Sequence, residues 1–336
     1  MDLLNGFVAL ANFVLIPAIA YGSQLALGAL GVTLIYGILR FSNFAHGDTM
    51  AVGTMFAVLA TWGLQSLGVS LGPFPTALLA IPFGIIGAAA LILLTDRYVY
   101  KFYRAQKAKP VILVIVSIGV MFIYNGFTRI IIGPDDQRFA DGARFVISAG
   151  DFKKLTGLEE GLALRTSQVI TVIAAVVIVA ILFWFLNKTR TGKSMRAFSD
   201  NEDLALLSGI NPERVVLVTW LIVATLATVA GVLYGLDKSF KPFTYFQLLL
   251  PIFASAIVGG LGNPLGAIAG GFVIAFSEVG ITYAWKKVLV YFMPPALEPD
   301  GLVQILSTEY KFAVSFVILV IVLLFRPTGL FRGKSL

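Results

Sequence analysis

Residues 166–187 read TSQVITVIAAVVIVAILFWFLN and contain no charged side chain. A membrane-spanning helix needs about 20 consecutive apolar residues, so this run is long enough to cross a bilayer. Further uncharged runs occupy residues 3–39, 49–95, 110–128, 215–236 and 242–277. The sequence therefore predicts an all-α, polytopic membrane protein with about eight or nine transmembrane helices, some of them broken or re-entrant.

The composition of the chain supports this fold class. Of its 336 residues, 58% are hydrophobic and 13% are charged, whereas soluble domains average about 45–50% apolar and about 25% charged residues. A disordered chain is excluded, and a water-soluble enzyme is disfavoured. The net charge of +7 indicates contact with anionic headgroups of the lipid bilayer rather than with nucleic acid. With no Cys and one His, disulfides and a Cys/His metal site are excluded.

The polar segments predict how a single transmembrane domain over residues 1–336 is oriented. Five Lys or Arg residues within 96–109, together with a basic C-terminal tail, mark the cytoplasmic side, because short cytoplasmic loops are enriched in positive charge. Alternation then places 134–165 and 285–307 outside and 188–214 inside, with a cytoplasmic C-terminus.

Two regions leave the number of spans open. Residues 3–39 form one long or two short helices, because Pro17 and Gly22 interrupt the run. The polar patch 40–48 either lies at the cytoplasmic edge between two spans or breaks a helix inside the membrane, where it would line the transport path. Residues 244–284 form either two short spans or a re-entrant pair, with helices at about 244–258 and 265–284.

The segment 188–214 contains a helix predicted over 194–208. Gly209 suits a left-handed helix stop. Such a helix either rests on the membrane surface or docks on a cytoplasmic partner. Its predicted face consists of Ala197, Phe198, Leu204, Ala205 and Ser208. The Gly-Lys-Ser strings at 192–194 and 333–335 lack the earlier glycine of a phosphate-binding loop, so they do not predict ATP binding.

Three ionisable side chains stand in or beside apolar segments. A charge at the bilayer centre costs about 2.5 kcal/mol or more, so these groups are expected to face the bundle interior. Asp48 is placed for the first turn of the following helix, His46 for a structural hydrogen bond, and Glu278 for an interhelical one. The alternative for each is a chemical role, such as a proton relay.

The glycine-rich string GGLGNPLG at 259–266 allows two interpretations. One is a tight turn between two closely packed helices. The other is a broken helix whose freed backbone groups bind substrate, a recurring arrangement in transporters.

Four motifs, in order along the chain, carry a resemblance to a known family. They are NFAHGD at 43–48, GKSMRA at 192–197 continuing to Gly209-Ile210, GGLG at 259–262 followed by Glu278, and RPTGL at 326–330. Together they resemble the permease subunits of branched-chain amino acid ABC transporters, in particular the LivH-type members, over nearly the whole chain.

The resemblance implies a subunit of a bacterial inner-membrane importer for Leu, Ile and Val. Its expected partners are a second homologous permease, two cytoplasmic ATPases that bind the ATP, and a periplasmic substrate-binding protein. The chain itself would hold no cofactor or metal and catalyse no reaction. The resemblance implies that the ATPase-coupling residues are Gly192, Arg196, Ala197, Asp200, Ala205, Gly209 and Ile210. Candidates for the translocation path or gate are Asn43, His46, Asp48, Gly259, Gly260, Gly262 and Glu278.

Other functions stay open at this point. Relatives in the same superfamily carry urea or short amides. A secondary transporter coupled to protons through Asp48, His46 or Glu278 and a non-transporting membrane scaffold are the remaining alternatives.

Overall fold

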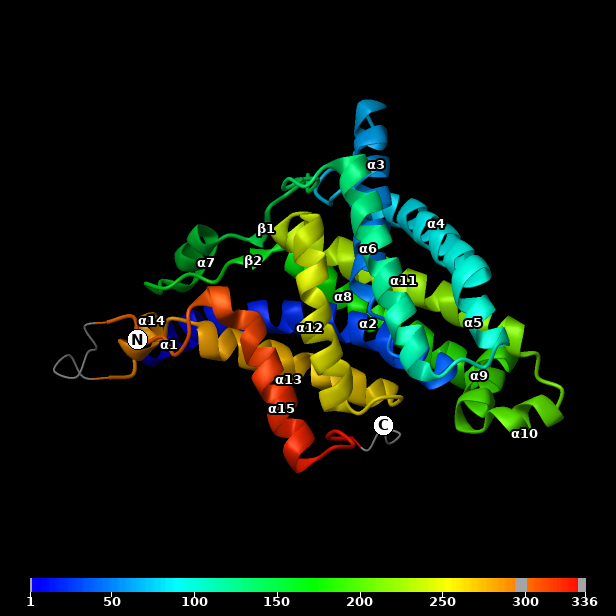
Figure 1. Cartoon of the computed structure of the whole chain (residues 1–336). Helices are drawn as coiled ribbons and strands as arrows, with labels where there is room; N and C mark the ends of the chain where they lie inside the picture. Colours follow the sequence, from blue (N-terminus) through cyan, green and yellow to red (C-terminus); the bar gives the residue numbers. More distant parts are fainter. Residues whose placement is uncertain (1, 294–300, 332–336) are drawn as a thin grey trace.

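The computed structural model describes residues 2–293 and 301–331 (Figure 1). Within these ranges, eight helical segments are long and apolar enough to span a membrane, so the predicted all-α polytopic fold is confirmed. They are α1-η1-α2 (Asp2–Leu39), α4-η2-α5 (Ala77–Ala105), α6 (Pro110–Ile132), α8 (Thr166–Lys188), α11 (Pro212–Lys238), α12 (Pro242–Gly259), α13 (Pro264–Thr282) and η4-α15 (Thr308–Phe325). A further long helix, α3 (His46–Ser66), starts inside the bundle.

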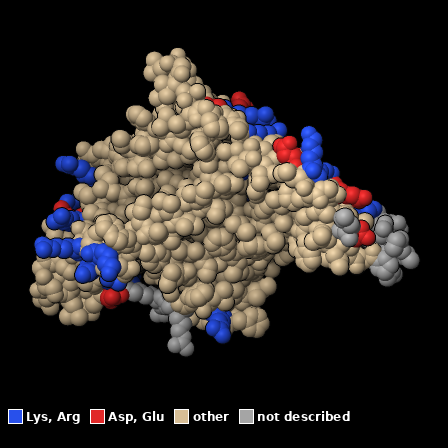
Figure 2. All heavy atoms as spheres, turned by 180° about the vertical axis from the view of Figure 1, so that it is seen from behind, with Lys and Arg blue, Asp and Glu red and all other residues tan. Residues whose placement is uncertain are grey.

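The short elements gather at two opposite ends of the bundle (Figure 1). One end, called the α7 end below, carries the antiparallel pair β1 (Phe145–Ile147) and β2 (Leu164–Arg165), α7 (Ala149–Thr156) and α14 (Lys286–Leu289). The other, called the α9 end, carries α9 (Arg190–Asp200) and α10 (Glu202–Leu207). Charged side chains collect toward opposite margins of the surface, with a broad, largely uncharged belt between them (Figure 2). An uncharged belt is the surface that a bilayer core requires.

The first long run forms one continuous helical segment rather than two helices. α1 (Asp2–Leu10) passes through the π-helical turn η1 (Ala11–Leu15) into α2 (Ile16–Leu39). Pro17 lies just after this turn. Because proline cannot donate to the carbonyl four residues earlier, the wider turn accommodates it without ending the helix. α2 is almost wholly buried and packs against α8, α11, α12 and α13.

The helix that begins at α4 (Ala77–Thr95) continues further than its sequence pattern indicates. The expected span ends near residue 95, but the helix runs on through the π-helical turn η2 (Asp96–Tyr100) and α5 (Lys101–Ala105). The expected end agrees with the end of α4, and the continuation beyond it was not expected. Within the continuation, Arg104 Nη1 and Nη2 bind Asp96 Oδ1 and Oδ2 at 2.5 and 2.9 Å.

The helix expected over 194–208 is wrong, because the chain forms two helices there. Asn201 adopts extended backbone angles between α9 and α10, and its side chain accepts a hydrogen bond from Leu204 N at 3.0 Å. An asparagine in this role begins a new helix. The single apolar face does not form either, since Phe198 and Ala205 are buried while Ala197 and Leu204 are exposed. Gly209 does adopt the expected left-handed conformation, at φ +78°.

Candidate translocation path and coupling surface

The polar patch 40–48 enters the interior of the helix bundle. Arg40 ends α2 in a left-handed conformation, and its guanidinium Nη2 donates to the Ser199 carbonyl of α9 at 2.5 Å. The chain then turns back into the bundle, so that α3 begins at His46. Arg40 thus lies at the α9 end, as the two-span alternative expects, while residues 43–48 lie in the interior, as the other alternative expects.

Protein groups satisfy the non-helical backbone of this patch. The Asn43 side chain accepts hydrogen bonds from Ala45 N at 3.1 Å and from the Tyr100 hydroxyl at 3.2 Å. Phe44 N donates to Ser117 Oγ at 3.0 Å. Irregular backbone inside a bilayer is tolerated only under such conditions or beside a water-filled cavity. The non-helical conformation of the patch is therefore stabilised by hydrogen bonds within the bundle.

His46 and Asp48 lie together in the first turn of α3 and are fully buried. The His46 imidazole packs against Gly31 of α2. Gly31 lies about 12 Å along the helix axis from the last residue of α2, so this contact is well inside the bundle. Asp48 Oδ1 accepts a hydrogen bond from Asn125 Nδ2 of α6 at 2.8 Å, while Oδ2 has no partner among the described residues. The position expected for Asp48 is confirmed, and the helix N-terminus favours its negative charge.

Glycines let α3 approach its neighbours closely around this patch. A Cβ at Gly47 would lie 2.7 Å from the Tyr245 carbonyl oxygen of α12, and one at Gly53 would overlap Thr228 of α11. The Tyr245 hydroxyl in turn donates to the Gly231 carbonyl at 2.8 Å. The interior patch is thus held by α2, α6, α11 and α12 together.

Glu278 occupies a separate place in the bundle. It is buried in α13, and its Oε1 accepts a hydrogen bond from Ser315 Oγ of α15, so the expected interhelical hydrogen bond is present. The Lys311 ammonium lies 4.6 Å from the centre of the Tyr21 ring beside it. Tyr21 and Gly31 are about 15 Å apart along α2, so Glu278 and His46 contact different levels of the same helix.

The glycine-rich string forms a tight turn between α12 and α13 at the α9 end. Gly260 and Gly262 have φ of +109° and +81°. A Cβ at Gly259 would overlap the Gly266 carbonyl, so the two helices touch through their backbones. The C-terminal segment closes this turn, because Leu330 N donates to the Val258 carbonyl at 2.8 Å and Asn263 Nδ2 donates to the Phe331 carbonyl at 2.9 Å. The structure does not bring these glycines to His46.

The expected coupling residues divide into internal and exposed groups. Gly192 is buried, and a Cβ there would overlap the Phe185 carbonyl of α8, while Ala205 is buried in α10 and its carbonyl accepts from Ile210 N at 3.1 Å. The exposed members are Arg196, Ala197, Asp200 and Gly209. Beside them, Leu204, Leu206 and Leu207 of α10 are exposed, which makes an apolar ridge at this end.

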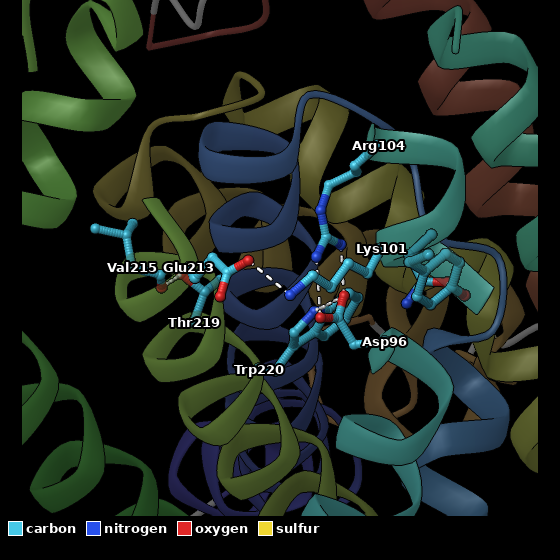
Figure 3. A network of polar contacts seen from close by, with 9 residues as sticks. Asp96, Lys101, Arg104, Glu213, Val215, Thr219 and Trp220 are labelled. Carbon is cyan, nitrogen blue, oxygen red and sulfur yellow. Dashed lines mark hydrogen bonds and ion pairs between the residues drawn. The ribbon is translucent and has the colours of Figure 1, made fainter. Parts of the chain in front are cut away.

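Sequence reasoning missed a polar junction around Asp96 (Figure 3). Asp96 pairs with Arg104 and also accepts a hydrogen bond from Trp220 Nε1 of α11 at 2.7 Å. The Trp220 ring stacks on Tyr100, the residue that binds Asn43. The one available signal was Asp96 itself, the single acidic residue within the basic segment 96–109.

Comparison with known proteins places this sequence in a family. A family model described as the permease component of a branched-chain amino acid transport system matches residues 14–323. The chain belongs to this family. The permease is 29% identical over 321 residues to the high-affinity branched-chain amino acid transport permease LivH of Salmonella typhimurium, covering 93% of this chain and 92% of that one.

Further relatives match over the same extent. The permease is 28% identical to BraD of Pseudomonas aeruginosa, a branched-chain amino acid transport permease, with 94% of each chain covered. It is 29% identical to a probable LivH of Methanocaldococcus jannaschii, covering 95% of this chain and 92% of that one. Among solved structures, PsaBC from Streptococcus pneumoniae in complex with Fab aligns with a TM-score of 0.46 and 12% identity, over 96% of this chain and 95% of that one.

The family membership confirms the identification made from the four motifs, and the chain is a multi-pass permease of the ABC importer type. The urea, short-amide and proton-coupled alternatives are not favoured by these relatives.

Proposed function

We propose that this permease carries branched-chain amino acids, Leu, Ile and Val, across a bacterial inner membrane. A periplasmic binding protein delivers the substrate, and two cytoplasmic ATPases drive the transport. The pore is formed with a second, homologous permease, and residues 1–336 act as one transmembrane domain. The observation that carries this proposal is the family match over residues 14–323. One contiguous buried cluster from Tyr21 to Ala275 supports the single domain.

The translocation path runs along the interior patch formed by Asn43, His46 and Asp48. Three features support this assignment: the helix break lies inside the bundle, α3 begins there, and Asp48 keeps one carboxylate oxygen without a partner among the described residues. Transporters recurrently use interrupted helices at their binding sites. Glu278 and the turn at Gly259, Gly260 and Gly262 act as gate elements. Glu278 joins α13 to α15, and the turn is bonded to the segment that follows α15.

The α9–α10 segment couples the permease to its ATPases. The exposed coupling residues and the apolar ridge of Leu204, Leu206 and Leu207 form the contact surface, while Gly192, Ala205 and Ile210 hold its shape. ATP energy enters as a difference in the affinity of two conformations for partners and substrate.

The α9 end faces the cytoplasm, as does the C-terminus. Residues 96–109 and 188–214 together contain ten Lys or Arg residues and five Asp or Glu residues. In contrast, residues 134–165 at the α7 end contain five basic and six acidic residues. The positive-inside rule supports this orientation.

The test is reconstitution of the copurified complex in proteoliposomes. Leucine uptake that requires ATP, both ATPases and the binding protein is the expected result. Urea and acetamide serve as competing substrates and should not inhibit uptake. Uphill leucine uptake by this chain alone, driven by a pH gradient without any ATPase, would overturn the proposal.

A further inference from the structure

A cavity of about 440 Å³ lies at the α9 end, between the coupling helix and the membrane bundle. Its walls come from α2, α8, α9 and the α12–α13 turn, and we call it the α9 cavity. Small-molecule sites in proteins typically measure about 300–1,000 Å³. None of the interior-patch residues Asn43, His46 and Asp48 lines it, so it is distinct from the path proposed above. It shares Arg196 and Asp200 with the proposed coupling surface.

The lining of the α9 cavity has two chemical parts. One part is aliphatic and aromatic, formed by Leu34 and Ile38 of α2 and by Phe183 and Leu186 of α8. The other part carries both charge signs on one helix, since Arg196 and Asp200 stand four residues apart on α9 and therefore on the same face. Arg196 Nη1 also donates to Asn187 Oδ1, another lining residue, at 2.9 Å. A guanidinium binds a carboxylate well and a carboxylate binds an ammonium. This combination suits an α-amino acid with an apolar side chain.

Thr33 of α2 places an unpaired hydroxyl on a residue that lines the cavity. The residue is 1% exposed, and its hydroxyl has no hydrogen-bond partner among the described residues. Other buried helical threonines fall into two groups. Thr49, Thr54 and Thr219 bond to the carbonyl four residues earlier at 2.8 Å, whereas the hydroxyls of Thr128 and Thr228, like that of Thr33, have no partner among the described residues. Because an unpaired buried hydroxyl is unfavourable, Thr33 is expected to bond to a group that enters the cavity.

We propose that the α9 cavity binds a free apolar α-amino acid from the cytoplasmic solution and that this binding inhibits transport. The regulatory part rests on the proposed function, because the inhibitor then belongs to the transported substrate class. An occupant would touch α2, α8 and α9 at once and hold the coupling helix in the position seen here. Arg40, which donates to the Ser199 carbonyl, already ties α9 to the end of α2.

Direct binding is the first measurement. The detergent-purified complex, without its binding protein, is dialysed to equilibrium against labelled L-leucine. Leucinamide, which lacks the carboxylate, and 4-methylpentanoate, which lacks the ammonium, are used as competitors. We expect leucine to bind and each analogue to compete at least about ten-fold more weakly, since each loses one charged contact. Absence of leucine binding, or equal competition by the analogues, would reject the site.

Two variants locate the binding in the cavity. Thr33→Val removes the hydroxyl at nearly constant volume and should weaken binding about five- to ten-fold. Leu265→Trp adds bulk at a lining residue that is 63% exposed and should abolish binding without disturbing the core. The matched control is Leu3→Trp on α1, where the leucine is 62% exposed and outside the cavity. Leucine binding that persists unchanged in both cavity variants would overturn the assignment.

Regulation is tested in proteoliposomes with the ATPases facing outward and substrate plus binding protein enclosed. External leucine should inhibit ATP-driven leucine export from the lumen in the wild type and in Leu3→Trp but not in Leu265→Trp. Equal inhibition in all three would reject the regulatory role. Inhibition that follows the anionic lipid content of the vesicles, rather than leucine, would show that a lipid headgroup fills the cavity and would also reject it. Lack of any ATP-driven transport would contradict the proposed function while leaving the binding result intact.

Discussion

The His46 imidazole lies against the backbone of α2 because position 31 is glycine. A Cβ there would lie 2.5 Å from His46 Cε1 and 2.9 Å from Nε2. We expect Gly31→Ala to displace the ring from the interior patch, since a packed interior does not absorb an extra methyl group freely. ATP-driven uptake should fall about ten-fold or more, while the complex still assembles and copurifies.

The control for this change is Gly119→Ala in α6. A Cβ at Gly119 meets no heavy atom within 4 Å, and alanine is a better helix former than glycine. Uptake should therefore stay at the wild-type rate. If Gly31→Ala also kept the wild-type rate of uptake, the position of the His46 ring would not matter for transport.

Asp141 makes the stability of the α7 end depend on pH. Its carboxylate accepts hydrogen bonds from Thr76 N and Oγ1, both at 2.6 Å, and from Gln65 Nε2 at 3.1 Å. Partial burial acts to raise the pKa of Asp141, but these hydrogen bonds outweigh it and lower the pKa below the usual value. A lowered pKa stabilises the fold above the unfolded-state pKa of about 3.9, and that stability is lost as the pH falls through the folded-state pKa.

Asp141→Asn should therefore lower the thermal midpoint at neutral pH, by the equivalent of about 1 kcal/mol. The difference from the wild type should stay constant down to about pH 5 and shrink below about pH 4. Thermal unfolding in detergent, monitored by circular dichroism, measures this difference in the thermal midpoint. Asp136→Asn, at an exposed position of the same loop, should change little. A deficit that grows on acidification would refute this account.

At the scale of single elements, α10 presents the apolar surface that is proposed to contact the ATPases. Leu207 is 84% exposed at its end. We expect Leu207→Glu to leave folding and membrane insertion intact but to remove the ATPases from the copurified complex, because a charge must then be desolvated at the interface. Leu155→Glu on α7 is the matched control, since Leu155 is also 84% exposed. Loss of the ATPases from both variants, or from neither, would count against α10 as the contact.

The long elements could be predicted from the sequence, because a bilayer imposes uncharged runs of fixed length. The helix breaks could be predicted only where glycine or proline marks them, as at 259–266. The continuation through 96–105 and the break at Asn201 were missed. Both depend on side-chain contacts, Arg104 with Asp96 and Asn201 with the backbone of Leu204, that a window of hydrophobicity does not detect.

The candidate site was predicted in composition but not in arrangement. His46, Asp48 and Glu278 were singled out as charges in apolar surroundings, and all three are buried. Their partners, Asn125 for Asp48 and Ser315 for Glu278, lie 77 and 37 residues away along the chain. No local sequence pattern predicts such pairs, because they form only when separate helices pack together.

At the scale of the whole molecule, the charge asymmetry between the α9 and α7 ends predicts which of them faces the cytoplasm. The chain has no cysteine, so a single introduced thiol reports one position without background. Leu207→Cys and Leu155→Cys place it at equally exposed sites at the two ends. In intact cells whose outer membrane has been permeabilised, a membrane-impermeant maleimide should label the Leu155 variant and spare the Leu207 variant. Inverted inner-membrane vesicles should give the opposite pattern, because basic loops stay on the cytoplasmic side. Labelling of the Leu207 variant in intact cells would reverse the orientation and would leave the coupling surface without access to ATP.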